Sequence, residues 1–277
     1  MRAILALLLL AGCAAQGEAP VATDGNYTEQ RLQVPVAGTE IFTRLCLPRG
    51  GATRPLVLIN HGSPSADLRP SQNVASCWSD AVQFFLARGH AVGLPLRRGY
   101  GANGGVWHEN FGPCDAPDYR RAGLEAARDM QAALTTLAAR PDVPAGPAIV
   151  VGQSAGGWGA VALAAQNPPG VRAYVSMAGG RGGRRANQPN NNCTPEALVR
   201  TAGGFGATAR TPMLWVYTAN DSYFGPDLAA RMHAAFTAAG GRARLESLGP
   251  YGRDGHSLFF GNQGVTIWGP LIEDFLR

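Results

Sequence analysis

Short apolar runs alternate with longer amphipathic stretches along most of this chain. Residues 29–36 and 40–47 are rich in β-branched and alternating apolar side chains, which predicts two short strands around a turn at Ala37 and Gly38. Residues 55–60 are apolar on both faces, as in a central strand of a sheet that is covered on both sides. These three segments predict the first strands of one sheet.

From residue 56 onward, predicted strands and helices follow each other in turn. The helices are recognised by apolar side chains three and four residues apart, and the strands by compact apolar runs. Such alternation predicts an α/β fold in which helices cover both faces of a mostly parallel sheet. The later predicted strands are residues 90–95, 148–152, 173–177, 213–218 and 243–248, and the predicted helices are residues 81–88, 117–140, 155–166, 227–239 and 265–276.

The N-terminus differs in composition from the rest of the chain. Arg2 precedes an apolar run that is too short to cross a bilayer, which indicates a secretory signal. Its end, Leu10-Ala11-Gly12-Cys13, resembles the lipobox of bacterial lipoproteins, in which the cysteine is diacylated and becomes the mature N-terminus. Cleavage near Ala15 is the alternative.

We therefore expect a lipoprotein signal peptide at residues 1–12, a flexible tether at residues 13–28 and a single domain at residues 29–277. Residues 179–210 are rich in glycine, asparagine and arginine, with one weak helical patch, and predict a short cap insertion. The expected location is the bacterial cell envelope, facing the periplasm, with a lipid anchor on Cys13. A secreted protein without an anchor is the alternative.

Four cysteines remain when Cys13 is set aside. An even number in an oxidising compartment favours disulfides, and the spacing fits no zinc motif. Cys77 and Cys114, which both lie in loops that lead into helices, are the expected pair. Cys46 lies within a predicted strand and is interpreted as a buried thiol, and Cys193 is left without an assigned partner. We expect no metal ion and no cofactor.

The charge distribution gives little support for a nucleic-acid partner. The formal net charge is +5, and all 24 basic residues are arginine. No stripe of arginines interleaved with aromatic residues is present in the sequence. The densest basic stretch, residues 181–185, is interpreted as a solvated loop in preference to an anion-recognition site.

The sequence Gly152-Gln153-Ser154-Ala155-Gly156 fits the pattern G-x-S-x-G and lies between a predicted strand and a predicted helix. The sharp turn between them requires small residues two positions before and after the serine. Ser154 is then exposed at the C-terminal edge of the sheet, beside a helix N-terminus whose amides favour negative charge. We predict Ser154 as a nucleophile; a tight turn with an incidental serine is the alternative.

A serine nucleophile needs a base, and the base needs an acid that orients it. Where this motif occurs in an α/β sheet, the acid and then the histidine follow the serine along the chain. His256, in a turn-rich loop after the last strand, is a better base than His233, which lies within a predicted helix. Asp221 follows a strand and is preferred as the acid over Asp227, which begins a helix, and over Asp254, which is too near the histidine in sequence.

Two backbone amides are expected to stabilise the negative charge that develops on the substrate's carbonyl oxygen. One is the N–H of Ala155, directly after the nucleophile. The other is the N–H of Ser63, in the sequence Asn60-His61-Gly62-Ser63-Pro64 after the first central strand. His61 is interpreted as a buried side chain that orients this loop.

Together these motifs resemble the α/β-hydrolases of the dienelactone hydrolase-like branch, which is related to the catalytic domains of prolyl oligopeptidases. The resemblance covers about residues 29–277. True dienelactone hydrolases carry a cysteine nucleophile, whereas this chain has Ser154, so their lactone substrate is not carried over. The resemblance rests on Asn-His-Gly-Ser at 60–63, residues 95–101, Gly-Gln-Ser-Ala-Gly-Gly at 152–157, Asp221, and Asp-Gly-His at 254–256.

These observations predict a serine hydrolase that cleaves small-molecule carboxylic esters through an acyl-enzyme on Ser154. One alternative is a peptidase or amidase related to prolyl oligopeptidases, although such peptidases carry a large propeller for which this chain has no length. Another is a noncatalytic lipoprotein that keeps the fold. The short insertion predicts an open site, and the expected substrate contacts are Tyr100, Trp107, Trp158 and Tyr223.

Overall fold

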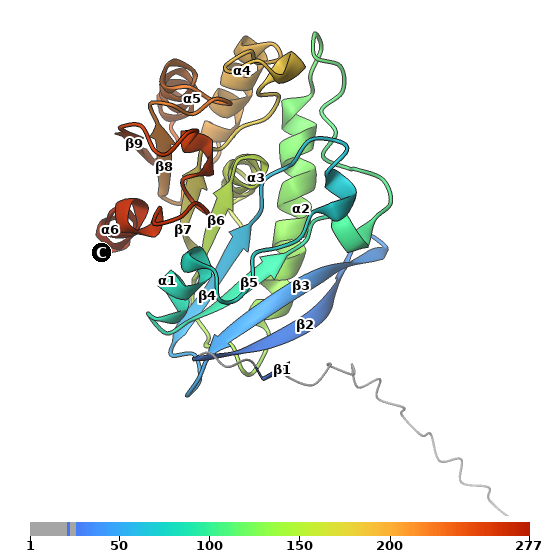
Figure 1. Cartoon of the computed structure of the whole chain (residues 1–277), viewed down its shortest axis with the longest axis vertical. Helices are drawn as coiled ribbons and strands as arrows, with labels where there is room; N and C mark the ends of the chain where they lie inside the picture. Colours follow the sequence, from blue (N-terminus) through green and yellow to red (C-terminus); the bar gives the residue numbers. More distant parts are fainter. Residues whose placement is uncertain (1–20, 23–25) are drawn as a thin grey trace, which may run out of the picture.

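The computed structural model describes residues 21–22 and 26–277. One nine-stranded sheet runs through this part of the chain, in the order β1-β2-β3-β5-β4-β6-β7-β8-β9 (Figure 1). Neighbours from β1 to β5 pair antiparallel, and neighbours from β5 to β9 pair parallel. The predicted α/β fold is confirmed. The strands are β1 (Val21–Ala22), β2 (Tyr27–Val36), β3 (Thr39–Pro48), β4 (Arg54–Asn60), β5 (His90–Pro95), β6 (Ala148–Gln153), β7 (Val171–Met177), β8 (Met213–Thr218) and β9 (Ala243–Leu248).

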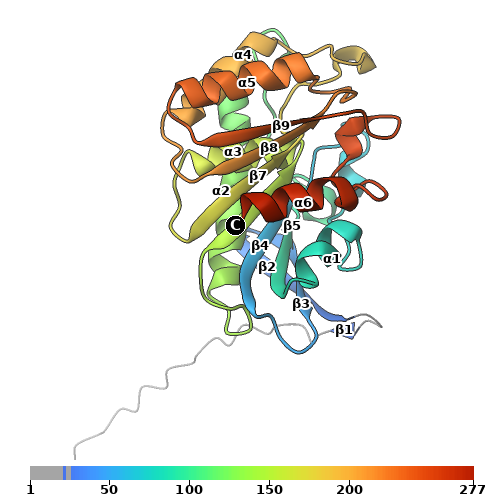
Figure 2. The same cartoon turned by 90° about the vertical axis from the view of Figure 1, so that its left-hand side faces the viewer.

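Helices cover both faces of the sheet, with α2, α3, α4 and α5 on one face and α1 and α6 on the other (Figure 2). Central strands are apolar on both sides for this reason. In β4, Leu56 and Leu58 face the first group of helices, whereas Val57 and Ile59 face the second. The helices are α1 (Asp80–Leu86), α2 (Tyr119–Ala138), α3 (Ala155–Ala164), α4 (Pro195–Gly206), α5 (Pro226–Ala238) and α6 (Val265–Phe275), and the short 3-10 helices are η1 (Arg69–Ser71), η2 (Gly101–Asn103), η3 (Arg185–Asn187) and η4 (Gly255–Ser257).

The expected cap insertion at residues 179–210 divides into two parts. Residues 179–194 contain only the short helix η3, whereas residues 195–206 form α4. Leu198, Ala202 and Phe205 bury one side of α4 in the same core as α3 and α5. This helix therefore belongs to the layer that covers the sheet, and only the preceding loop extends toward the edge of the sheet where Ser154 lies.

The N-terminal boundary is earlier than expected. Strand β2 begins at Tyr27, and β1 pairs with its Thr28 and Glu29. Two short stretches of the expected tether are thus part of the sheet. The expected signal peptide and Cys13 lie outside the described residues. None of the described helices combines the length and the apolar character needed to cross a membrane.

The predicted disulfide between Cys77 and Cys114 is wrong. Cys46 bonds to Cys77, with 5.7 Å between the Cα atoms, and Cys114 bonds to Cys193, with 4.7 Å. Cys46 is therefore not a free thiol. Cys46 and Cys77 are both buried in the core beneath α1, whereas Cys114 lies against the loop after β7. Two disulfides are compatible with an extracytoplasmic protein.

Candidate active site

Ser154 occupies a strained turn between β6 and α3. Its backbone has φ 54° and ψ −117°, which is rare for a residue other than glycine. A Cβ atom at Gly152 would lie 2.1 Å from the carbonyl oxygen of Gly156, and one at Gly156 would lie 2.4 Å from that of Asn60. Neither position therefore accommodates a side chain, which is the steric requirement expected from the sequence.

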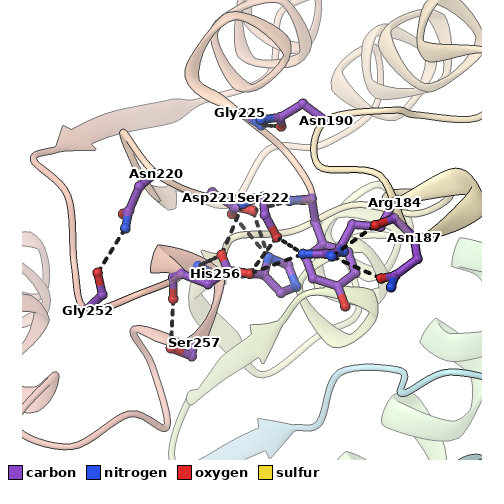
Figure 3. Close-up of polar contacts among 12 residues, drawn as sticks. Arg184, Asn187, Asn190, Asn220, Asp221, Ser222, Gly225, Gly252, His256 and Ser257 are labelled. Atoms are coloured by element: carbon purple, nitrogen blue, oxygen red, sulfur yellow. Dashed lines mark hydrogen bonds and ion pairs between the residues drawn. The ribbon is translucent and has the colours of Figure 1, made fainter.

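Ser154, His256 and Asp221 form a continuous chain of hydrogen bonds, although 102 residues separate the serine from the histidine. Nε2 of His256 lies 2.9 Å from Oγ of Ser154. Its Nδ1 lies 3.0 and 3.1 Å from the two carboxylate oxygens of Asp221 (Figure 3). In the tautomer that carries its proton on Nδ1, the ring donates to Asp221. Nε2 is then free to accept the serine proton.

Asp221 is fixed in place by the loop in which it lies. Its side chain is buried, and Oδ1 accepts hydrogen bonds from the amides of Tyr223, at 2.8 Å, and Phe224, at 2.9 Å. The ring of Tyr223 also stacks on that of His256, with 4.1 Å between centroids. The acid and the base are thus held by the same short segment after β8.

Asp254, His233 and Asp227, the alternatives for the acid and the base, make other contacts. Asp254 accepts hydrogen bonds from the amides of Ser222 and His256, at 3.0 and 3.1 Å. Burial raises the pKa of Asp254, but these bonds and that of the Ser222 hydroxyl outweigh burial and lower it. Asp254 therefore holds the histidine loop in place. His233 contacts the carbonyl oxygen of Ala243, and Asp227 lies in the first turn of α5.

Gln153, which the sequence did not single out, links the nucleophile turn to the histidine loop. Its Nε2 donates to the backbone carbonyl oxygen of His256 at 3.0 Å. No local pattern distinguishes this residue, because the x positions of G-x-S-x-G accept many side chains. Its contact arises only when the loop after β9 folds over β6.

The two amides expected to stabilise an oxyanion belong to residues that line one cavity with Ser154. The amide of Ala155 is the first in α3, so no carbonyl one turn earlier in the helix accepts from it. Ser63 lies in the loop held by His61, as expected. Nε2 of His61 accepts from the amide of Arg97 at 3.2 Å, and Nδ1 lies 2.6 Å from the carbonyl oxygen of Gly62. Burial, together with the charge of Arg97, lowers the pKa of His61 well below its usual value, so the ring is neutral.

Two cavities meet at Ser154. The first has a volume of about 470 Å³ and includes Ala155, Arg181 and Trp107; the second has about 550 Å³ and includes His256 and Trp78. Ser63, Pro64, Ser154 and Tyr223 line both cavities. The reacting oxygen thus lies where two separate spaces join, one on the side of Ala155 and one on the side of the histidine.

Residues 56–272, more than half of the chain, match the model of the alpha/beta hydrolase family. The chain belongs to this family. No curated protein matches its sequence. The family assignment agrees with the strand order and with the position of Ser154 between β6 and α3.

Solved structures share the fold of this hydrolase at low sequence identity. Acylaminoacyl peptidase from Pyrococcus horikoshii has a TM-score of 0.67 and 14% identity over 92% of this chain, but this chain spans only 42% of the peptidase. Acetyl xylan esterase from Paenibacillus sp. R4 has a TM-score of 0.66 and 15% identity, over 94% of this chain and 87% of the esterase. A protein from Klebsiella pneumoniae assigned as a dienelactone hydrolase has a TM-score of 0.60 and 16% identity, over 91% of this chain and 100% of its own.

Two of the four expected substrate contacts line the cavities of this hydrolase. Trp107 lines the first cavity and Tyr223 lines both. Tyr100 and Trp158 line neither cavity, so these two expectations were wrong. Trp158 is buried between α2, α3 and α4, where its Nε1 donates to the carbonyl oxygen of Tyr119 at 2.9 Å and its ring packs against Phe205.

Tyr100 instead belongs to a buried charged cluster formed by Arg97, Tyr100, Glu109 and Arg181. The Tyr100 hydroxyl donates to Oε2 of Glu109 at 2.9 Å, and both arginines form ion pairs with that carboxylate. The interpretation of residues 181–185 as a solvated loop is wrong for Arg181, which is 4% exposed. Sequence reasoning missed Arg97 and Glu109 as partners, because nothing local links the loop after β5 to the loop after β7.

Among the described residues, no three His, Cys, Asp or Glu side chains are placed to hold a metal ion.

Proposed function

We propose that this protein is a serine hydrolase that cleaves carboxylic esters of small molecules through an acyl-enzyme on Ser154. The hydrogen-bonded chain from Ser154 through His256 to Asp221 is the observation that carries the proposal. A buried carboxylate beside the imidazole stabilises the imidazolium that forms when the serine loses its proton. The adjacent strained turn presents Oγ at the junction of the two cavities.

In the first half-reaction, Oγ of Ser154 attacks the ester carbonyl carbon while its proton moves to Nε2 of His256. The carbonyl oxygen becomes negative and accepts hydrogen bonds from the amides of Ser63 and Ala155. The bond between the acyl carbon and the alcohol oxygen then breaks, and its electron pair stays on that oxygen. The proton on Nε2 passes to the departing alcohol.

In the second half-reaction, water attacks the acyl carbon and gives one proton to Nε2 of His256. The tetrahedral oxygen again accepts from the same two amides. The bond between the acyl carbon and Oγ breaks, Oγ takes the proton back from Nε2, and the carboxylic acid leaves. Asp221 remains ionised throughout and keeps the ring in the tautomer that both steps need.

An ester is the preferred substrate class because the acetyl xylan esterase is matched over most of its length, whereas the acylaminoacyl peptidase is matched over less than half. A peptidase or amidase activity is the second candidate, supported by that partial similarity. A protein that keeps the fold without catalysis is the third. The intact chain from Ser154 to Asp221 favours the enzyme over this third candidate.

We also propose that the protein is lipid-anchored at Cys13 in the bacterial cell envelope and faces the periplasm. The lipobox resemblance and the two disulfides support this location. We expect membrane fractions to hold the wild-type protein and Cys13→Ser to release it. Equal distribution of both forms would favour secretion without an anchor.

The experiment that tests the proposed activity is labelling with a fluorophosphonate probe, followed by a panel of esters and amides. We expect wild type to label, Ser154→Ala not to label, and the exposed-site control Ser71→Ala to label fully. We further expect turnover of short-chain esters to exceed that of prolyl amides. An unlabelled wild type would overturn the catalytic proposal, and efficient amide cleavage without ester turnover would favour the peptidase.

A further inference from the structure

The first cavity carries charge of only one sign. Its lining includes Arg181 and Arg184 and contains no aspartate or glutamate. The second cavity has no arginine, aspartate or glutamate among its lining residues. The two spaces on either side of Ser154 therefore differ in charge, and only the first offers cations to a substrate.

Arg181 has an incomplete set of partners. Its side chain is 4% exposed, and its Nε has no hydrogen-bond partner among the described residues. It shares the single carboxylate of Glu109 with Arg97, which is fully buried. Arg97 also lies in the field of the buried carboxylate of Asp129, whereas the one carboxylate that pairs with Arg181 is the shared one of Glu109. A buried guanidinium that shares its counter-charge and lacks a hydrogen bond is costly. Arg69, which lies 4.0 Å from the ring of Trp107, adds positive charge nearby.

Arg184, the other arginine of the first cavity, has several polar partners. Its guanidinium donates to Oγ of Ser222 at 2.8 Å and to the side chain of Asn187 at 2.9 Å (Figure 3). It also lies 3.8 Å from a carboxylate oxygen of Asp254. The charge of Arg184 is thus already paired at the rim of the cavity. Arg181, by contrast, has a buried Nε without a hydrogen-bond partner among the described residues.

Arg181 is also held firmly beside the nucleophile. The amide of the preceding Gly180 donates to the carbonyl oxygen of Ser154 at 3.2 Å. One residue further along, Gly182 accepts from the amide of Cys193, which is bonded to Cys114. These bonds hold the backbone on both sides of Arg181, and the ion pair with Glu109 holds its side chain. A side chain preorganised in this way loses little conformational entropy when it binds an anion.

The positions of Ala155 and His256 decide which part of the substrate meets Arg181. In the proposed mechanism the alcohol receives its proton from His256, which lines only the second cavity. Ala155 lines only the first cavity, where Arg181 also lies. The departing alcohol therefore occupies the second cavity, and the acyl group extends into the first.

We propose that the first cavity is a carboxylate-binding subsite in which Arg181 pairs with a carboxylate on the acyl part of the substrate. The substrate class is then the monoesters of short dicarboxylic acids. A guanidinium and a carboxylate form paired hydrogen bonds whose geometry suits this role. This inference rests on the proposed ester hydrolysis and adds the identity of the acyl group.

The first test compares substrates that differ by one terminal group. Monoethyl glutarate places a carboxylate where ethyl pentanoate has a methyl group, and both release ethanol. We expect kcat/KM of the wild-type protein to be at least about tenfold higher for monoethyl glutarate. The reversed pair is 3-(butyryloxy)propanoate and propyl butyrate, in which the carboxylate is on the alcohol. We expect no preference for 3-(butyryloxy)propanoate over propyl butyrate. If the protein prefers 3-(butyryloxy)propanoate and shows no preference for monoethyl glutarate, the assignment of the two cavities is overturned.

The second test changes the arginine. Arg181→Gln is expected to reduce the glutarate-to-pentanoate ratio of kcat/KM to about one. Arg181→Lys keeps the charge and is expected to retain part of the preference for monoethyl glutarate. The matched control is Arg185→Gln, which removes the same charge from an exposed position on the same loop and leaves the ratio unchanged. Thermal unfolding monitors folding of each variant. A ratio unaffected by Arg181→Gln would overturn the proposal, as would a wild-type ratio near one.

A binding measurement separates this proposal from that of catalysis. Calorimetry with Ser154→Ala and monoethyl glutarate reports recognition without turnover, with ethyl pentanoate as the reference ligand. Binding of the acid with no hydrolysis by the wild-type protein would refute the esterase and keep the anion subsite. Hydrolysis of neutral esters without preferential binding of the acid would refute the subsite and keep the esterase.

Discussion

Gln153 and His256 are joined by a hydrogen bond of 3.0 Å from the side-chain amide of one to the backbone carbonyl oxygen of the other. The residue before the proposed nucleophile therefore holds the loop that carries the proposed base. Because His256 reaches its position from the loop after β9, this contact acts together with those of Asp254 and Asp221 to set the distance between Nε2 and Oγ of Ser154.

We predict that Gln153→Glu lowers kcat for ester hydrolysis about five- to tenfold. The substitution keeps the shape of the side chain but replaces the donor with an acceptor that faces the carbonyl of His256, and loss of one hydrogen bond costs about 1 kcal/mol. Steady-state kinetics and the rate of fluorophosphonate labelling measure the effect. Gln166→Glu, at an exposed position after α3, is the control. Equal kcat in both variants would show that the contact does not position the histidine.

We predict that Tyr100 titrates near pH 8. Burial alone raises the pKa of Tyr100, but the charges of Arg181 and Arg97 outweigh burial and lower it to about 8. Absorbance at 295 nm should show one tyrosine ionising between about pH 7 and 9 in the native protein. Tyr100→Phe should remove this transition, and Arg181→Gln should move it to higher pH.

The same titration carries a functional consequence. Above pH 8 the phenolate of Tyr100 offsets the positive charge of Arg181, so the preference for monoethyl glutarate over ethyl pentanoate should decline. Tyr100→Phe should keep the preference at pH 9. A preference that is constant from pH 7 to 9 in wild type would contradict this coupling.

We predict that the protein loses stability as the pH falls below about 6.5. Burial lowers the pKa of both His61 and His90 in the folded state. Below the ordinary histidine pKa the unfolded chain binds protons that the folded protein does not, so the free energy of unfolding decreases, by at most about 1.4 kcal/mol per pH unit for each histidine. Urea unfolding at pH 7.5 and 5.5 measures the slope. His61→Asn and His90→Asn should each reduce it, and an unchanged slope in both would contradict the prediction.

We predict that removing the Cys114–Cys193 disulfide weakens both stability and acid recognition. The bond spans 79 residues, for which the chain-entropy estimate is about 4.5 kcal/mol. Cys114→Ser with Cys193→Ser should also release the loop of Arg181, and the glutarate-to-pentanoate ratio of kcat/KM should fall. Thermal unfolding and substrate kinetics give the two readouts.

The other disulfide supplies the control for this experiment. Cys46→Ser with Cys77→Ser removes a bond that spans 31 residues and lies beneath α1, away from Arg181. This double variant should lose stability and keep the substrate ratio. If both double variants change the ratio equally, the effect comes from general destabilisation and not from the loop that carries Arg181.

Most elements of the fold were predictable because each depends on a short pattern. The boundaries of β5, β8 and β9 agree with the expected residues 90–95, 213–218 and 243–248. Helix α4 was the hardest to predict from the sequence, because glycines interrupt its apolar face and only a weak helical patch precedes them. Its burial against α3 and α5, and not its own helix propensity, makes it a regular helix.

The sequence by itself determined the order of the elements and the placement of Ser154, Asp221 and His256 at strand ends. These features follow from local hydrophobic periods and from the clearance that the strained turn at Ser154 requires. Only the tertiary structure decided which cysteines pair, why Trp158 packs away from the cavities, and that Arg181 is buried beside Glu109. Each of these depends on which distant loops meet at the edge of the sheet, and a side chain's burial and partners are set there, not by its neighbours in sequence.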